Sequence, residues 1–159
     1  MLKSAVKNKS NRVVYISSSE VYGSKLKDQP YQESDYGYVD LLNPRSCYPS
    51  SKRASETLCS AYTSEYGLDT VVVRPGHIYG PTITDTDDRA SAQFTRCAVE
   101  GKDIVIKSAG TQLRSYCYVL DCASAILTVL LSGESGQAYN ISNPNSIVSI
   151  AQLAKAFAA

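Results

Sequence analysis

The chain has 159 residues, of which 43% are hydrophobic, and 16 basic residues nearly balance 15 acidic ones, giving a net charge of +1. This length allows one domain with a sizeable core, and the balanced charge offers no basic face for nucleic acid or a membrane surface. The longest strongly apolar run, AILTVLL, falls far short of the roughly 20 residues that a membrane-spanning helix needs. We therefore expect a cytoplasmic protein without nucleic-acid or membrane partners.

The cysteines are odd in number and form no CxxC pair, which argues against a disulfide framework or a zinc site. They are Cys47, Cys59, Cys97, Cys117 and Cys122. We expect reduced thiols and no bound metal.

In the first half of the chain, apolar runs rich in β-branched residues alternate with segments of helical spacing. In order, we expect the end of a helix at 1–12, a strand at 12–17, a long polar loop at 19–46, a helix at 48–67 closed by Gly67, and a buried strand at 69–75. A loop of nearly thirty residues inside a domain is usually functional or disordered.

The second half continues the alternation. We expect a helix at 89–101, strands at 103–108 and 114–119, a helix at 121–133 with Asp121 as its N-cap, a strand at 137–142 and a helix from 149 onward. Such alternation predicts an α/β fold with a mostly parallel sheet and flanking helices.

The first expected strand leads into a cluster of hydroxyl groups followed by a carboxylate: Ser17, Ser18, Ser19 and Glu20. Parallel α/β sheets place their ligand crevice at the carboxyl ends of their strands, which is where these residues fall. We expect the hydroxyls to point into a pocket. The alternative without function is a polar strand exit.

The next expected helix begins with Tyr48 and carries Lys52 one turn later on the same face. A phenol titrates at about 10 in water, so a tyrosine that acts as a base at neutral pH needs a positive neighbour. Lys52 supplies that charge, and Ser18 can bind the same substrate oxygen. The pattern indicates proton removal from an alcohol with a nicotinamide cofactor as hydride acceptor, although the spacing alone also occurs by chance. Pro49 places Tyr48 at or just outside the helix start.

Four segments in this order, ISSSEVYG, NPRSCYPSSKRASE, VVVRPGHIYGP and GTQLRSYCYVLD, resemble the extended short-chain dehydrogenase/reductase superfamily of nucleotide-sugar epimerases, dehydratases and decarboxylases. The resemblance covers almost the whole chain. It implies an incomplete Rossmann-like parallel sheet with a small C-terminal substrate-binding part. It also implies that Ser18, Tyr48 and Lys52 oxidise the sugar C4 hydroxyl while NAD, which Ser17 helps to bind, takes the hydride.

Within this family the chain is most similar to UDP-glucuronate decarboxylases and dTDP-glucose 4,6-dehydratases. The dehydratases carry an aspartate where this chain has Ser19, which counts against dehydration, and epimerases commonly lack an acid at the position of Glu20. The resemblance therefore implies decarboxylation of a 4-keto sugar, with Glu20 facing the carbons beyond C4 and Ser19 contacting the substrate. Dehydration and C4 epimerisation stay open as alternatives.

Substrate binding is implied for three further residues of the same motifs. Arg114 matches an arginine that grips the diphosphate of a nucleotide sugar, a role that suits a guanidinium fork, and the alternative is an exposed salt bridge. Arg89 matches an arginine near the nucleotide. His77 stands where the family usually has asparagine, so it either donates to a phosphate or satisfies a loop carbonyl.

The family binds NAD through a glycine-rich turn after its first strand, and neither GxGxxG nor GxxGxxG occurs in this sequence. We therefore expect residues 1–159 to be a single domain truncated at both ends, the C-terminal portion of an enzyme whose NAD-binding half is missing and which is inactive alone. The competing hypothesis is a non-catalytic folded scaffold. An unpaired sheet edge would favour a homo-oligomer in either case.

Overall fold

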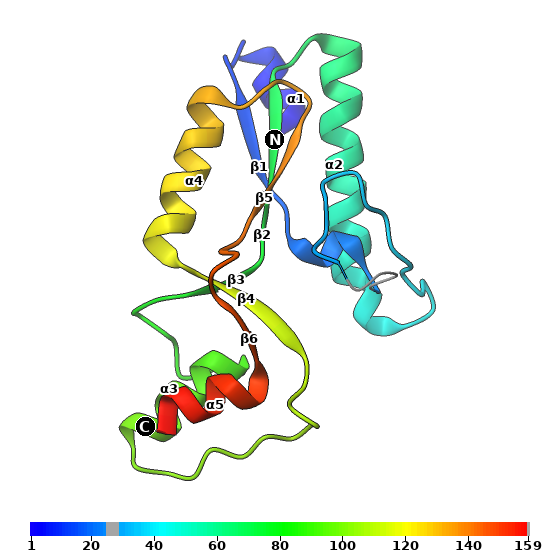
Figure 1. The fold of residues 1–159 in the computed structure, drawn as a ribbon. Coiled ribbons are helices and arrows are strands. Elements are labelled where there is room, and N and C mark those ends of the chain that lie inside the picture. Colours follow the sequence, from blue (N-terminus) through cyan, green and yellow to red (C-terminus); the bar gives the residue numbers. More distant parts are fainter. Residues whose placement is uncertain (25–28, 159) are drawn as a thin grey trace. The chain divides into compact units, whose positions relative to one another are not determined.

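A computed structural model of the chain describes residues 1–24 and 29–158 (Figure 1). Residues 25–28 of the expected loop lie outside this description. The chain divides into two units, of which the first comprises Met1–Gly76 and Cys122–Ile141 and the second His77–Asp121 and Ser142–Ala159. The expectation of a single truncated domain stays a prediction.

The first unit is built on a parallel sheet of three strands: β1 (Val13–Ile16), β2 (Thr70–Pro75) and β5 (Ala138–Ile141). Their order is β1-β2-β5, and both pairings are parallel. The central strand β2 buries five consecutive residues because it is covered on both faces, and Val71 and Val73 are fully buried. The predicted α/β fold with a Rossmann-like parallel sheet is confirmed.

Three helices accompany this sheet: α1 (Leu2–Lys7), α2 (Cys47–Tyr66) and α4 (Val119–Ser132). Figure 1 shows α2 beside one side of the sheet and α4 beside the other. Gly67 ends α2 in the left-handed conformation, at φ +62°, as predicted. The predicted N-cap role of Asp121 is wrong. Strand β4 runs directly into α4 at Val119, so Asp121 lies inside the first turn of the helix. Its negative charge there still stabilises the helix by interacting with the positive end of the helix dipole.

The long segment between β1 and α2 is not a plain loop. It contains two short 3-10 helices, η1 (Ser19–Tyr22) and η2 (Pro44–Ser46). The chain also folds back on itself through an antiparallel bridge between Ser24 and Tyr38. The segment is therefore held by backbone hydrogen bonds on both sides of residues 25–28.

The second unit has a smaller sheet in which β3 (His77–Tyr79) pairs in parallel with β4 (Leu113–Tyr118), and β4 pairs antiparallel with β6 (Ile147–Ser149). Helices α3 (Ala90–Val99) and α5 (Ile150–Ala158) pack against each other. The sequence pattern did not reveal β3 or β6, which are three residues each.

The predicted strand at 103–108 is wrong, because this segment forms no ladder in the described structure. Ile104 and Ile106 instead line an apolar pocket with Ala151 and Ala154 of α5, while Val105 points to solvent with 68% of its surface exposed. An alternating apolar pattern thus arises here from packing against a helix.

None of the helices in the described part of the chain is both long and apolar enough to span a bilayer.

Candidate functional site

The serine cluster begins where β1 ends. Ser17 continues the ladder through its amide, which donates to the Val73 carbonyl at 2.8 Å, and the residue is buried with 4% of its surface exposed. Its hydroxyl oxygen Oγ is buried and has no hydrogen-bond partner in the described part of the chain. Buried hydroxyls are normally paired, so this orphaned group is suited to a ligand.

The next residues form the turn η1. Ser18 caps it, because its Oγ accepts a hydrogen bond from the Glu20 amide at 3.2 Å. Ser18 and Ser19 are half-buried, whereas Glu20 is exposed. The turn therefore presents two hydroxyls and one carboxylate at the carboxyl end of β1.

Tyr48 and Lys52 lie on the first two turns of α2. Tyr48 is the second residue of the helix, so it lies one residue inside the helix start and not outside it, and Pro49 is accommodated within the first turn. Of the Tyr48 surface, 49% is exposed. The Lys52 ammonium Nζ donates to the Ile16 carbonyl at 2.8 Å and lies 5.7 Å from the centre of the Tyr48 ring. Tyr15 of β1 lies under the same ammonium at 5.2 Å. The lysine thus joins the start of α2 to the end of β1.

Helix α2 also packs against η1. Tyr48 and Lys52 therefore lie on a helix that contacts the serine turn, at the strand end where the sequence placed them. The chemical roles of Ser17, Ser18, Ser19, Glu20, Tyr48 and Lys52 stay predictions.

A buried polar network below this edge escaped the sequence analysis. Arg74 of β2 donates two hydrogen bonds to the Glu56 carboxylate, at 3.0 and 2.7 Å, and a third to the Tyr22 hydroxyl at 2.9 Å. The Tyr22 hydroxyl in turn donates to Asn140 Oδ1 at 2.6 Å. The signal in the sequence was one arginine within the apolar run VVVRP, since a charge in a central strand needs a buried partner.

The network shifts the ionisation of its members. Burial raises the pKa of Tyr22 above its usual value, against the opposing influence of the Arg74 guanidinium. Burial alone would lower the pKa of Arg74, but its hydrogen bonds to Glu56 and Tyr22 outweigh burial and raise it. Both groups therefore keep one protonation state at neutral pH, and the network acts as a fixed support.

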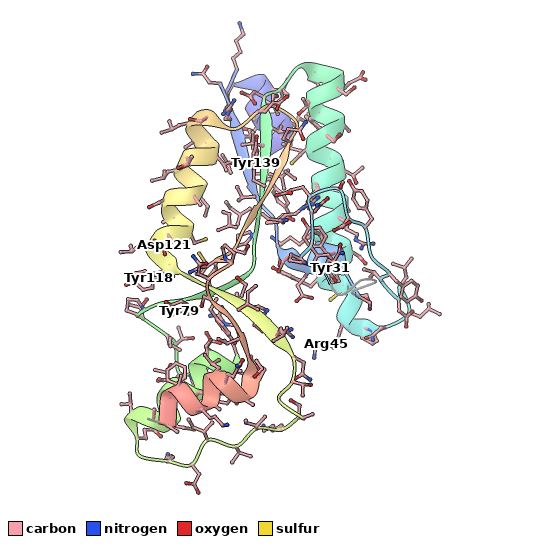
Figure 2. The ribbon with its side chains drawn as sticks, viewed as in Figure 1. Tyr31, Arg45, Tyr79, Tyr118, Asp121 and Tyr139 are labelled. Carbon is pink, nitrogen blue, oxygen red and sulfur yellow. The ribbon has the colours of Figure 1, made fainter. Side chains whose placement is uncertain are left out.

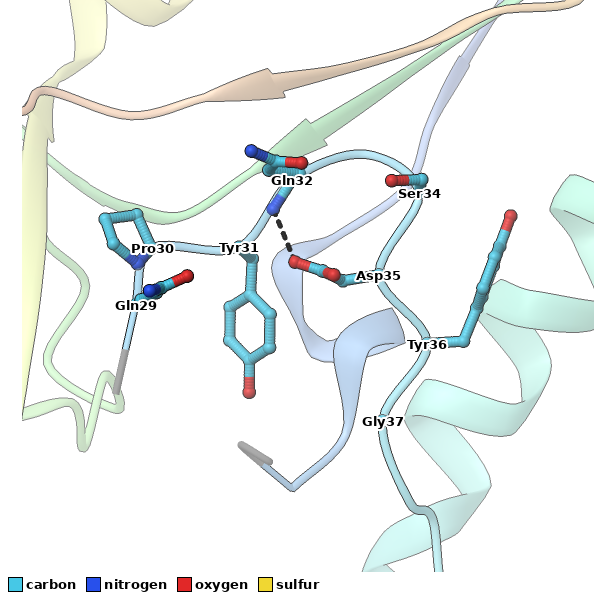
Figure 3. Close-up of a pocket in the computed structure, with 8 residues that line it drawn as sticks. All are labelled: Gln29, Pro30, Tyr31, Gln32, Ser34, Asp35, Tyr36 and Gly37. Atoms are coloured by element: carbon cyan, nitrogen blue, oxygen red, sulfur yellow. Dashed lines mark hydrogen bonds between the residues drawn. The ribbon is translucent and has the colours of Figure 1, made fainter. Parts of the chain in front are cut away.

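Figure 2 labels Tyr31 in the segment beside α2, and its ring stacks on that of Tyr22 with centroids 4.5 Å apart. An open pocket lies along this segment and is lined by residues 29–32 and 34–37 (Figure 3). Asp35 accepts a hydrogen bond from the Gln32 amide at 2.7 Å and so shapes its rim. No predicted site residue lines this pocket.

The three predicted substrate-binding residues of the other motifs belong to the second unit. His77 lies in β3, and its ring is 5.8 Å from that of Tyr116 in the neighbouring strand. Arg114 lies in β4 and donates to the Leu113 carbonyl at 2.9 Å.

The described residues contain no group of three or more histidines, cysteines or acids that could hold a metal ion.

Arg89 directly precedes α3 and is held by the Asp87 carboxylate. Its Nε donates to both carboxylate oxygens, at 2.9 and 3.0 Å, and its Nη2 forms an ion pair with Asp87. The hydrogen bond from the Arg89 guanidinium lowers the pKa of Asp87 to about 2. A phosphate that binds Arg89 therefore competes with Asp87.

Comparison with known proteins decides the family. Residues 1–142 match the model of the NAD dependent epimerase/dehydratase family. The chain belongs to that family.

Curated members of the family resemble the chain over nearly its whole length. UDP-glucuronic acid decarboxylase 6 of Arabidopsis thaliana is 35% identical over 146 residues, covering 91% of this chain and 42% of that protein. The dTDP-D-glucose 4,6-dehydratase of Mus musculus is 34% identical over 144 residues, covering 91% of this chain and 38% of that protein.

A solved structure in the family shares the fold. The crystal structure of dTDP-glucose 4,6-dehydratase from Bacillus anthracis in complex with NAD superposes with a TM-score of 0.86 at 28% identity, covering 98% of this chain and 48% of that one. The chain spans less than half the length of the curated relatives it matches.

Proposed function

We propose that this chain is the part of an NAD-dependent nucleotide-sugar-modifying enzyme that oxidises C4 of the sugar and then decarboxylates the 4-keto product. The observation that carries the proposal is the placement of Lys52, whose ammonium joins the Ile16 carbonyl at the end of β1 to the ring of Tyr48. A phenol beside a fixed cation at the carboxyl end of a parallel strand suits proton removal from an alcohol.

In this mechanism Tyr48 takes the proton of the C4 hydroxyl, and Ser18 holds the C4 oxygen through a hydrogen bond. Lys52 stabilises the negative charge that the phenol carries as a base. NAD, when bound, supplies the acceptor for the C4 hydride and the source of its later return. The exposure of the Tyr48 side chain leaves it accessible to a sugar.

The residues at the end of β1 fit the nicotinamide side of NAD. Ser17 presents a buried hydroxyl without a partner in the described residues, and such a group is satisfied by a polar atom of a ligand. Tyr48 and Lys52 stand at the same strand end. We assign cofactor contact to these three residues.

Decarboxylation follows from the 4-keto sugar when C6 is a carboxylate, because the substrate is then a β-keto acid. The C5–C6 bond breaks, carbon dioxide leaves, and the electron pair moves into the enolate of the ketone. A proton added at C5 restores the ketone before C4 is reduced again. We propose that Glu20 faces C5 and C6 of the sugar. Ser19 has no acidic proton with which to expel a C6 hydroxyl, and we assign it to contact with the substrate.

We assign the diphosphate of the nucleotide to three residues of the other motifs. Arg114 and Arg89 provide guanidinium forks that suit phosphate oxygens, and His77 can donate to the same group. Because Asp87 already holds Arg89, we assign the stronger role to Arg114.

The test is product analysis. The chain, extended N-terminally to the length of its relatives, is incubated with NAD and either UDP-glucuronate or dTDP-glucose, and the products are identified by mass spectrometry. We expect UDP-glucuronate to lose carbon dioxide. Loss of water from dTDP-glucose instead would make the protein a 4,6-dehydratase. Inversion at C4 without loss of carbon dioxide or water would make it an epimerase. Unchanged substrates would favour the non-catalytic scaffold.

A further inference from the structure

Arg53 follows Lys52 on α2 and reaches across to the segment beyond β1. Its Nε donates to the Val21 carbonyl at 2.6 Å, and its Nη2 donates to the Gly37 carbonyl at 2.7 Å. Both acceptors are backbone atoms, and they lie sixteen residues apart. One side chain therefore holds two separate stretches of chain.

These two stretches lie against each other. The Ser24 amide donates to the Tyr38 carbonyl at 2.8 Å, and the two residues form a bridge. A Cβ atom added at Gly37 would lie only 2.2 Å from the Tyr22 carbonyl oxygen, so the backbones approach as closely as glycine allows. Arg53 binds both members of this close pair.

We propose that Arg53 is a positioning residue for the proposed reaction, because it fixes the turn that carries Ser18 and Glu20 to the helix that carries Tyr48 and Lys52. Val21 is the residue after Glu20 and belongs to η1. Arg53 is the residue after Lys52. The guanidinium thus sets the spacing between the candidate base and the hydroxyl that binds the same oxygen, a spacing on which such catalysis depends steeply.

The contact requires a guanidinium. Its planar fork carries donors that point in different directions and serve the two carbonyls at once, whereas a lysine ammonium is a compact charge on a flexible stem. Arg53→Lys keeps the charge and most of the length but loses the fork. Arg53→Met removes the charge as well.

Arg12 offers a matched control in the same unit. It also donates from a partly buried guanidinium, to Asp69 at 2.8 Å and to the Leu130 carbonyl at 2.9 Å. These contacts join the start of β1 to the end of α4 and touch neither η1 nor the start of α2. Arg12→Lys therefore removes a comparable fork without touching the candidate site.

The first measurement is amide hydrogen exchange on the chain itself, with no cofactor. In Arg53→Lys and Arg53→Met we expect exchange of the Ser24 amide to accelerate about tenfold or more, since the bridge loses its anchor. Exchange of the Ser17 amide, bonded to Val73 in the sheet, should change less than twofold in Arg53→Lys. Arg12→Lys should leave Ser24 unchanged. An unchanged Ser24 amide in both Arg53 variants would overturn the inference.

The second measurement is hydride transfer in the chain extended N-terminally to the length of its relatives. For Arg53→Met we expect kcat to fall by roughly tenfold to a hundredfold with a much smaller change in KM, and added guanidinium ion to restore part of the loss. Faster exchange at Ser24 with unchanged kcat would overturn the positioning role. Absence of hydride transfer in the unsubstituted protein would overturn the proposed function and, with it, the positioning role of Arg53 in catalysis. The exchange data would still decide whether Arg53 fixes the turn.

Discussion

Arg74 on the central strand and Glu56 on α2 form a buried ion pair with two parallel hydrogen bonds, at 3.0 and 2.7 Å. Only 4% of the Arg74 side chain and 14% of the Glu56 side chain are exposed. Glu56 lies one turn beyond Lys52 on the same face of the helix. The pair therefore fixes α2 to the sheet at the level just below the candidate site.

Replacing Glu56 by glutamine should destabilise the protein strongly, because it leaves the Arg74 guanidinium buried without its counter-ion. We expect a loss of about 3 kcal/mol in the free energy of unfolding, measured by urea denaturation. The control is Glu100→Gln, since Glu100 pairs with Lys102 at the surface, where solvent screens the two charges, and this variant should lose much less stability. Equal losses in the two variants would contradict a structural role for the buried pair.

Tyr22→Phe removes one hydroxyl from the same network. Arg74 Nη1 keeps its bond to the Glu33 carbonyl, but Asn140 Oδ1 loses the Tyr22 donor. We expect a loss of about 1 to 3 kcal/mol in the free energy of unfolding. Tyr66→Phe, at an exposed position of α2, should change it by no more than about 0.5 kcal/mol. A neutral Tyr22→Phe would show that the hydroxyl contributes nothing to the support.

Two glycines test the close approach of backbone beside η1. Gly23 and Gly67 have nearly equal positive φ angles, +67° and +62°, but a Cβ atom at Gly23 would lie 2.3 Å from the Tyr38 carbonyl oxygen whereas Gly67 faces open space. Gly67→Ala should therefore cost only the backbone strain, about 1 to 2 kcal/mol. Gly23→Ala should destabilise the protein more, because the backbone at Tyr38 must also move. Thermal denaturation of both variants measures this difference. Equal losses of stability in the two variants would show that the contact is unimportant.

The pair of Asp87 and Arg89 should be visible in acid. Its hydrogen bonds lower the pKa of Asp87 from 3.8 to about 2 in the folded protein, so the pair stabilises the fold above pH 3.8 and loses this effect as the pH falls toward 2. The carboxyl carbon shift of Asp87 in an NMR titration should report the low value. Arg89→Gln should move the titration back toward 3.8, and an unaltered midpoint would contradict the pairing.

The sequence predicted the parallel sheet, the helix closed by Gly67 and the order of the longer helices and strands, because β-branched runs and glycine caps act locally. It did not reveal β3 or β6, since strands of three residues carry too little pattern. It predicted a strand at 103–108, where Ile104 and Ile106 instead line a pocket shared with α5. An alternating apolar pattern shows that one side of a segment is buried, but it does not show whether a neighbouring strand or a helix covers that side.

For the candidate site, the placement of Tyr48 and Lys52 one turn apart on one helix followed from their spacing, whereas Pro49 did not keep Tyr48 out of the helix. The bond from Lys52 to the Ile16 carbonyl could not be foreseen, because it joins residues 36 apart through tertiary packing. The same reason hid the contacts of Arg53 and Arg74, whose partners lie on other elements. The pairing of Arg89 with Asp87, two residues away, was within reach of the sequence and gives that arginine a competing partner.

The most direct test of the proposed function is the rate at which the chain, extended N-terminally to the length of its relatives, reduces NAD on mixing with UDP-glucuronate. Tyr48→Phe should lower this rate by about a hundredfold or more, because the base that accepts the C4 proton is lost. Tyr66→Phe alters the same helix at a similarly exposed tyrosine and should leave the rate unchanged. Full turnover in Tyr48→Phe would contradict the account.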